Sequence, residues 1–339
     1  MSRAVPVSPT PPVLALPATS AELAGRLQDG LAEVDALLRR EVDHDDPFIA
    51  GANVHLAEAG GKRFRPLLTL LAAEVGSGVN DEVVAAATGV ELTHLASLYH
   101  DDVMDEALVR RGAPSANALY DNSTAILVGD LLFGTASSII ADLGPEAVKI
   151  QAQTFVRLCS GQIRDARPAP EGVDPVDYYL QVLADKTGVL IATAARYGAM
   201  FAGCDPVAVE TLREYGERLG MAFQLADDLI DISSDSADTG KTPGTDLREG
   251  KRTLPVLFAL ASTDPADARL QELLRSELRD EDSLVEALEL LRVHPAMGLA
   301  QEQTNAVAQE AVAALESLPD SEARTALAAL AGSVVTRVG

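Results

Sequence analysis

Tryptophan is absent from the sequence, aromatic residues make up only 4% of it, and there are only two cysteines. With so few aromatic side chains, the core of this 339-residue chain has to be built from alanine, leucine and other aliphatic residues, which favours helices. Cys159 and Cys204 lack the spacing of a metal or redox site. This indicates a reducing compartment and predicts a cytoplasmic location.

Basic residues are scarce as well. The 27 lysines and arginines face 51 aspartates and glutamates, which gives a net charge of −24. Such a chain repels nucleic acids and anionic lipid head groups, so neither is an expected partner. Long apolar runs are also lacking. The most apolar segment, TAILVGDLLFGTASSIIA at 124–141, carries Asp130 in its middle, and no helix is expected to span a membrane.

Five prolines interrupt the first 17 residues, which argues against the unbroken apolar core of a signal peptide and predicts a disordered tail over 1–19. From Ser20 onward, apolar residues recur at the steps of three and four that are typical of amphipathic helices. Besides a first helix capped by Thr19 or Ser20, the predicted helices cover 65–76, 81–105, 121–142, 145–164, 175–202, 206–232, 253–263, 266–277, 281–291 and 297–337. No segment alternates like a strand and no linker divides the chain, so residues 20–339 are predicted to form a single all-α domain.

Two acidic motifs with the same spacing, DDVMD and DDLID, lie inside predicted apolar helices. In the first motif, Asp101 and Asp105 are four residues apart and therefore share a helix face, with His94 two turns before them. Like charges at this spacing repel by about 0.2–0.5 kcal/mol per pair, which a bound cation would more than offset. Ligands that are all oxygen suit a hard ion, Mg²⁺ first. Asp102 lies off this face and is expected to support the ligands.

The second motif repeats the pattern, with Gln224, Asp227 and Asp231 on one helix face and Asp228 off it. Either motif alone would more often be a solvated surface. Finding the same spacing twice favours metal binding.

Cations gather near both motifs, against the acidic background of the chain. Arginine makes bidentate contacts to phosphate, lysine offers a movable charge, and a Mg²⁺ ion held by few carboxylates shares its remaining positions with substrate phosphates. These cations are Lys62, Arg63 and Arg65 in GGKRFRP, Arg110 and Arg111 after the first motif, and Lys241 and Lys251 in the long polar loop over 233–255. A loop of this length is usually functional or disordered. Ordinary surface cations are the alternative interpretation.

In its motifs GGKRFRP, THLASLYHDDVMDEALVRRG, Lys186–Thr187, FQLADDLID and GKTPGTDLREGKRTLP, the sequence resembles the trans-isoprenyl diphosphate synthases, or polyprenyl synthetases. The resemblance extends from about residue 20 to the C-terminal helices and is greatest to long-chain bacterial members, especially those of actinobacteria, which make side chains of respiratory quinones. It implies a helical bundle around a central apolar cavity. It also implies a Mg²⁺-dependent prenyltransferase that adds isopentenyl diphosphate to an allylic diphosphate primer. A homodimer is expected, and a transient membrane contact for product release is compatible with the family.

The resemblance also implies a role for individual residues. The diphosphate of isopentenyl diphosphate is expected at Lys62, Arg65, His94 and Arg111. The allylic diphosphate is expected at Arg110, Lys186, Lys241 and Lys251. Asp101, Asp105 and Asp227 match direct Mg²⁺ ligands, and Asp102, Asp228 and Asp231 complete the two clusters. Thr187 and Gln224 match polar groups beside the reacting allylic carbons, and with Lys186 they form the expected catalytic set.

Chain length in this family depends on the residue five positions before the first aspartate. Here this residue is Ala96, followed by Ser97. Both side chains are too small to close the bottom of the cavity, which implies a long product. The alternative role for Ala96 is close helix packing. A shorter-chain geranylgeranyl or farnesyl diphosphate synthase and the catalytic subunit of a heteromeric synthase remain open. The second DDxxD motif argues against a terpene cyclase, and an apolar tunnel would not be needed by a phosphohydrolase.

Two kinds of residue near these motifs are not assigned to the site. His100 is expected to hydrogen-bond to a neighbouring helix rather than bind a metal. Tyr178, Tyr179, Phe201 and Phe223 are expected in the core.

Overall fold

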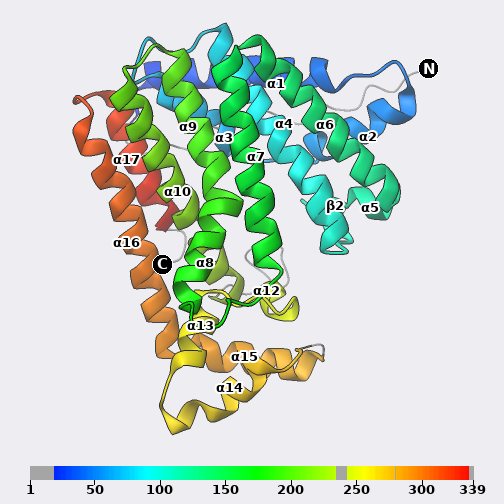
Figure 1. Ribbon diagram of the computed structural model, residues 1–339, viewed down its shortest axis with the longest axis vertical. Helices are drawn as coiled ribbons and strands as arrows, with labels where there is room; N and C mark the ends of the chain where they lie inside the picture. Colours follow the sequence, from blue (N-terminus) through cyan, green and yellow to red (C-terminus); the bar gives the residue numbers. More distant parts are fainter. Residues whose placement is uncertain (1–18, 234–242, 279, 336–339) are drawn as a thin grey trace. The chain divides into compact units, whose positions relative to one another are not determined.

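The structure is a computed structural model that describes residues 19–233, 243–278 and 280–335 (Figure 1). Its contacts divide the chain into two units. The first contains Met1–Lys149, Tyr197–Cys204 and Ser321–Ala326, and the second contains Ile150–Arg196, Asp205–Asp320 and Leu327–Gly339. Helices provide nearly all the regular structure of the described residues, as the all-α prediction requires. The single-domain assignment of residues 20–339 stays a prediction.

The first unit is organised around α4. Its helices are α1 (Ala21–Val42), α2 (Pro47–Glu58), α3 (Phe64–Ala73), α4 (Asp81–Met104), α5 (Ala116–Leu119) and α6 (Asn122–Asp142). Helix α4 lies side by side with α6 along most of its length and also packs on α1 and α3 (Figure 1). Asn80 begins α4, because its side chain accepts the N–H of Val83 at 2.9 Å and satisfies a donor that the helix leaves unpaired.

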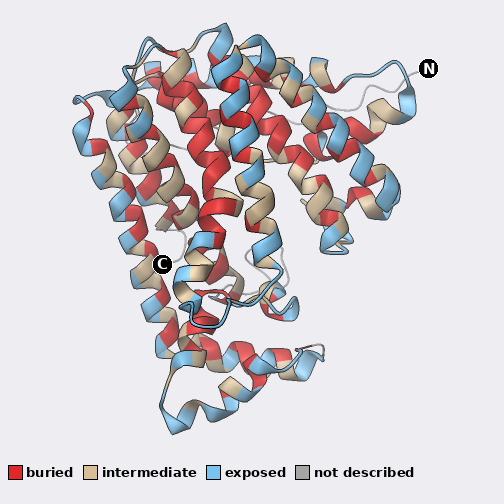
Figure 2. Cartoon of the chain, viewed as in Figure 1, coloured by how far each residue is buried: buried red, intermediate tan, exposed pale blue. Residues whose placement is uncertain are grey.

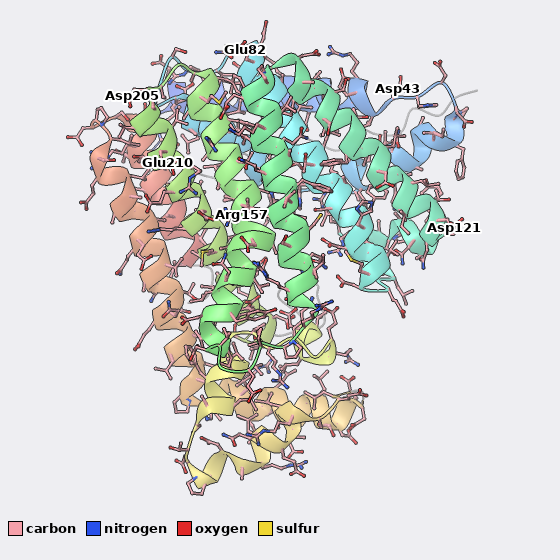
Figure 3. All side chains as sticks on the ribbon, viewed as in Figure 1. Asp43, Glu82, Asp121, Arg157, Asp205 and Glu210 are labelled. Atoms are coloured by element: carbon pink, nitrogen blue, oxygen red, sulfur yellow. The ribbon has the colours of Figure 1, made fainter. Side chains whose placement is uncertain are left out.

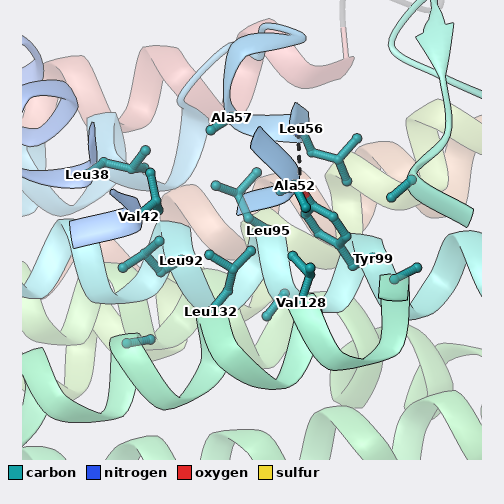
Figure 4. Close-up of a cluster of buried hydrophobic side chains, with 14 residues drawn as sticks. Leu38, Val42, Ala52, Leu56, Ala57, Leu92, Leu95, Tyr99, Val128 and Leu132 are labelled. Carbon is teal, nitrogen blue, oxygen red and sulfur yellow. Dashed lines mark hydrogen bonds between the residues drawn. The ribbon is translucent and has the colours of Figure 1, made fainter. Parts of the chain in front are cut away.

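A cluster of aliphatic residues and one tyrosine forms the core between α2, α4 and α6 (Figure 4). Leu95 and Leu132 are fully buried in it. The hydroxyl of Tyr99 donates to the carbonyl oxygen of Ala52 at 2.5 Å and accepts the N–H of Leu56 at 3.3 Å. Tyr99 therefore fixes α2 against α4, close to the end of the helix that carries the first acidic motif.

The second unit is organised around α10. The elements that lie in it or reach it are α7 (Pro145–Asp165), α8 (Pro175–Leu183), the π-helical turn η1 (Ala184–Gly188), α9 (Val189–Phe201), α10 (Pro206–Ser233), α12 (Thr245–Arg248), α13 (Leu254–Ala261), η2 (Pro265–Asp267), α14 (Ala268–Arg275), α15 (Glu281–Arg292), α16 (Pro295–Ala314), η3 (Leu315–Ser317) and α17 (Glu322–Val335). Helix α10 packs on α16 and on η1. Buried residues form stripes along the helices of each unit, with exposed residues on the opposite faces (Figure 2).

Most predicted helices are confirmed within a few residues, but the short helices α5 and α12 are not predicted, and larger corrections are also needed. Helix α2 is missing from the prediction, although Asp46 caps it and Pro47 opens it. The helix predicted over 297–337 is wrong as one piece, because the chain leaves the helix around Pro319, which has no N–H to donate. A two-residue hairpin, β1 (Val109–Arg110) with β2 (Ala113–Pro114), stands where no strand is predicted.

Helix α6 also corrects the sequence analysis. Its 21 residues have a mean hydropathy of 1.7 over the most apolar window, so by length and composition it could cross a membrane. Only 33% of that window is buried in the structure. A core helix passes the same test, so this property alone decides nothing about location.

Candidate active site

The first acidic motif lies at the C-terminal end of α4. The helix ends at Met104, and the N–H of Asp105 still bonds to the carbonyl oxygen of Asp101 at 2.8 Å. Asp101 and Asp105 are therefore one helical turn apart, and neither is buried. The negative end of the helix dipole adds to the attraction of these carboxylates for a cation.

Asp102 has a different role from its two neighbours in the motif. It is fully buried, and its Oδ1 accepts a hydrogen bond from Nε of Arg110 at 2.6 Å. Burial raises the pKa of Asp102, and the charge and hydrogen bond of Arg110 oppose that rise. The pair holds Arg110, which belongs to β1, beside the exposed carboxylates. Asp102 thus lies off the Asp101–Asp105 face, as the helical spacing predicts.

The cations of GGKRFRP divide into two kinds. Arg63 begins α3 with a left-handed backbone (φ 46°). Its guanidinium donates hydrogen bonds to Asp35 at 2.8 Å and to Glu91 at 3.1 Å, both within the protein. It is a structural residue, and its grouping with the phosphate-binding cations is not supported by these contacts. Lys62 is exposed at the same turn, and Arg65 lies in the first turn of α3.

Arg65 and Arg111 form a cationic group around the buried Glu91, and the imidazole of His94 interacts with both arginines. Burial lowers the pKa of Arg65 to about 10, with Glu91 opposing the change and Arg111 adding to it. The Nε of Arg65 is buried without a hydrogen-bond partner. Burial and the positive charges of Arg65 and Arg111 lower the pKa of His94 well below its usual value, so its imidazole is neutral. The structure therefore brings together three of the four residues predicted for one diphosphate.

Arg111 is positioned by the backbone around the two glycines. Its Nη1 donates to the carbonyl oxygen of Leu56 at 3.0 Å and to that of Gly60. A Cβ at Gly61 would lie only 3.0 Å from the same nitrogen. The second glycine of GGKRFRP is therefore needed for the guanidinium to approach the loop.

The second acidic motif is built on α10. Asp228 is 3% exposed and accepts hydrogen bonds from Nε2 of Gln224, at 3.1 Å, and from the hydroxyl of Tyr179. Burial and the negative charge of Asp246 raise the pKa of Asp228 to about 7, although the two hydrogen bonds lower it. The helical spacing predicts Gln224 on the face of Asp227 and Asp231, whereas its amide turns to Asp228. Oε1 of Gln224 also accepts the Thr187 hydroxyl at 3.5 Å.

Asp231 connects α10 to the polar loop. Its carboxylate accepts the N–H groups of Thr245 at 3.3 Å and Asp246 at 3.1 Å, and it thereby caps α12. Burial raises the pKa of Asp246 to about 6, and Lys251 opposes the rise from 3.6 Å. Lys251 also pairs with Glu249 at 2.6 Å, and its predicted contact with the allylic diphosphate stays a prediction. Lys241 falls outside the described residues.

Lys186 and Thr187 lie in the π-helical turn η1, between α8 and α9. Nζ of Lys186 is 2.7 Å from Oδ2 of Asp165 on α7. Isolated π turns inside α-helices occur frequently at functional sites. The periodicity of 175–202 gives no sign of this interruption, and only the Lys–Thr dipeptide indicates it.

The two acidic motifs suit a divalent cation because their donors are carboxylate oxygens. Among the described residues, no three His, Cys, Asp or Glu side chains form a ready-made cage for a metal. Each motif would therefore hold an ion with few protein ligands, which leaves coordination positions for substrate oxygens.

The sequence profile of the polyprenyl synthetase family matches residues 46–291, which include both acidic motifs and every cation described above. The chain belongs to the polyprenyl synthetase family. It is 48% identical over 320 residues to the nonaprenyl diphosphate synthase of Mycobacterium tuberculosis, covering 94% of this chain and 96% of that protein.

Solved structures of other polyprenyl synthetases have the same all-α fold. A geranylgeranyl pyrophosphate synthase from Corynebacterium glutamicum, complexed with calcium and isoprenyl diphosphate, has a TM-score of 0.85 at 44% identity, covering 94% of this chain and 98% of its own. A decaprenyl diphosphate synthase from Rhodobacter capsulatus has a TM-score of 0.85 at 36% identity, covering 94% and 99%. The resemblance inferred from the motifs is confirmed.

Several residues that shape this polyprenyl synthetase site are absent from the sequence-based set. Glu91, Asp165 and Asp246 each stand next to a predicted cation. Tyr179, expected in the core, instead donates to Asp228. Glu91 alone leaves a signal in the sequence, because it is a single charge inside the apolar stretch of α4 and such charges are buried only when paired.

The remaining predictions concern α4. Ala96 is 2% exposed inside the core cluster, and the hydroxyl of Ser97 donates to the carbonyl oxygen of His94 at 2.8 Å. Close packing explains the small size of Ala96 locally, and its influence on chain length stays a prediction. His100 contacts the carbonyl oxygen of Ile126 at 3.1 Å, so its hydrogen bond to a neighbouring helix is confirmed.

Proposed function

We propose that this polyprenyl synthetase is an all-trans long-chain polyprenyl diphosphate synthase. It would extend an allylic diphosphate by repeated head-to-tail addition of isopentenyl diphosphate. The observation that carries the proposal is that Arg110 is held by Asp102 of the first acidic motif, and that Lys251 pairs with Asp246, whose N–H bonds to Asp231 of the second motif. Similarity to a nonaprenyl and a decaprenyl diphosphate synthase supports the long product.

In the proposed reaction, the allylic C–O bond breaks, diphosphate leaves and an allylic cation forms. Mg²⁺ held by the two acidic motifs would neutralise the negative charge of the departing diphosphate. Arg110, Lys186 and Lys251, with Lys241, would hold the departing diphosphate as fixed or movable cations. The double bond of isopentenyl diphosphate attacks the cation and a proton is lost, so each addition releases one diphosphate.

The second substrate would be held by the cationic group around Glu91. Lys62, Arg65 and Arg111 supply charge to the diphosphate of isopentenyl diphosphate, and the neutral His94 supplies a hydrogen bond without further repulsion among the cations. Thr187 and Gln224, linked at 3.5 Å, would present their oxygens to the allylic carbons. Holding both substrates in place supplies the orientation that the carbon–carbon bond requires.

Several broader features belong to the same proposal. We infer a homodimer, because α6 exposes Ile126, Leu127 and Leu131 in a row that a second copy could cover. The protein would work in the cytoplasm, contact membranes transiently to release its product, and supply side chains of respiratory quinones. The small side chains of Ala96 and Ser97 would leave room for the chain to grow.

A geranylgeranyl diphosphate synthase is the second candidate. The 44% identity to a geranylgeranyl pyrophosphate synthase favours it. The purified protein with Mg²⁺, isopentenyl diphosphate and farnesyl diphosphate should release diphosphate only when both substrates are present, in proportion to the isopentenyl units incorporated. Release of inorganic phosphate, or of diphosphate without incorporation, would contradict a prenyltransferase. Absence of any reaction with every allylic primer would point to a missing partner subunit.

A further inference from the structure

The π turn that carries Lys186 and Thr187 is held by one face of α7, within the second unit. Asp185, the residue before Lys186, is 5% exposed. Its two carboxylate oxygens accept hydrogen bonds from Nε of Arg157 at 2.8 Å and from Nη1 of Arg164 at 2.5 Å. A buried carboxylate is costly unless it is paired, so these two arginines define where Asp185 and its neighbours can lie.

The backbone of the π turn also packs directly on α7. Gly161 lies between the two arginines on α7, and a Cβ there would meet the backbone nitrogen of Lys186 at 2.5 Å. Arg157, Gly161 and Arg164 follow the i, i+4, i+7 spacing of a single helix face. The same helix ends with Asp165, which lies 2.7 Å from Nζ of Lys186.

Hydrogen bonds of Arg157 also connect α7 to α10. Arg157 (Figure 3) also donates from Nη2 to Glu217 at 2.5 Å, and Glu217 accepts from Arg213 at 2.7 Å. Burial raises the pKa of Glu217, but its hydrogen bonds and charge interactions with the two arginines outweigh this and keep its pKa below the usual value. The three elements that meet here are α7, the π turn and α10, and α10 carries Gln224 and the second acidic motif.

We propose that Asp185 is a positioning residue for the allylic diphosphate site. Clamped by Arg157 and Arg164, it holds the π turn so that Thr187 is presented toward Gln224 on α10 and Lys186 is kept beside Asp165 on α7. The inference rests on the proposed function of Lys186 and Thr187. Asp185 directly precedes Lys186 and Thr187 in the same five-residue turn, so loss of the clamp displaces these two side chains first.

The test is Asp185→Asn, which keeps the size of the side chain and removes its charge. At a temperature well below unfolding, the KM for farnesyl diphosphate should rise about fivefold or more, while the KM for isopentenyl diphosphate stays within about twofold. Gly161→Ala, which changes no charge, should give the same asymmetry. Arg218→Ala removes the ion pairs of this α10 residue with Glu214 on the same helix and with Glu310 on α16, and both KM values should then equal those of the wild type.

A lower melting temperature with both KM values unchanged, or an equal rise in both, would overturn the positioning role. Hydrogen exchange of the amides of residues 184–188 gives a readout independent of activity, and it should be faster in Asp185→Asn than in the wild type. If the wild type elongates no primer, the proposed function fails, whereas unchanged exchange in Asp185→Asn shows that the clamp itself is wrong. If Asp185→Asn does not fold, Arg164→Lys provides the same comparison.

Discussion

Arg110 donates from Nε to Oδ1 of Asp102 at 2.6 Å, and this aspartate, from the middle of an acidic motif, is fully buried. The pair explains how three aspartates can lie so close together in the first acidic motif. Asp102 does not add a third repelling charge to Asp101 and Asp105, because the guanidinium of Arg110 neutralises it. The same contact ties Arg110, the cation proposed to bind phosphate, to the motif that holds the proposed metal ligands.

Breaking this pair from one side should be costly. Arg110→Met leaves the carboxylate of Asp102 buried without its partner, which should lower the free energy of unfolding by about 3 kcal/mol. Urea unfolding at neutral pH measures this. The double variant Arg110→Met/Asp102→Asn should recover at least half of the loss. Arg40→Met, which breaks an exposed pair with Glu41, should cost less than about 1 kcal/mol. An equally small cost for Arg110→Met would contradict the buried-pair interpretation.

The glycine pair of GGKRFRP should affect one substrate only. Gly61→Ala brings a methyl group within 3.0 Å of the Arg111 guanidinium, so the KM for isopentenyl diphosphate should rise about tenfold with little change for the allylic primer. Gly60→Ala is the matched control, because nothing lies within 4 Å of its Cβ although its φ of +91° strains an alanine. It should lower stability without this substrate selectivity. Equal kinetic effects of the two variants would show that the contact with Arg111 is unimportant.

The neutral His94 predicts a pH dependence. Because its pKa in the folded protein lies well below 6.5, the unfolded chain binds more protons than the folded one between these two values. The stability that His94 contributes is present above pH 6.5 and is lost as the pH falls toward the folded pKa. Thermal unfolding between pH 7.5 and 5 should therefore show the stability difference between wild type and His94→Gln shrinking as the pH falls. Parallel curves for the two proteins would contradict a neutral imidazole at His94.

Removal of the metal, or of its ligands, should stop the chemistry without unfolding the protein. Chelation by EDTA should abolish elongation, and added Mg²⁺ should restore it. Asp101→Asn and Asp227→Asn should each lower kcat about 100-fold or more, since they weaken stabilisation of the departing diphosphate. Asp142→Asn, which changes an exposed carboxylate at the end of α6, should leave kcat unchanged. Full activity of either motif variant would show that the carboxylate is not a ligand.

The sequence predicts best the helices that are determined by residues close together in the chain. Apolar spacing locates α10, because burial of one face depends on neighbours three and four residues apart. Helix α4 is located instead by its long apolar stretch, which is buried on nearly all sides. Helix α2 was missed because its apolar residues surround it rather than forming one stripe, and only its cap at Asp46 indicates where it begins.

Contacts between distant parts of the chain could not be predicted. The partner of Lys186 is Asp165, and that of Asp228 is Tyr179, and no spacing rule connects residues 21 or 49 positions apart. The π turn escaped prediction for a related reason, since its extra residue hardly disturbs the apolar pattern. The types of residue in the site follow from the chemistry of diphosphate binding, whereas their pairing follows from tertiary packing.

The length of the product is the most direct test of the account. Purified protein with Mg²⁺, farnesyl diphosphate and an excess of labelled isopentenyl diphosphate should yield, after dephosphorylation, a ladder of prenols that ends well beyond geranylgeraniol. A ladder that stops at geranylgeraniol would contradict the long-chain function and the open floor at Ala96, although the enzyme would still be a prenyl diphosphate synthase.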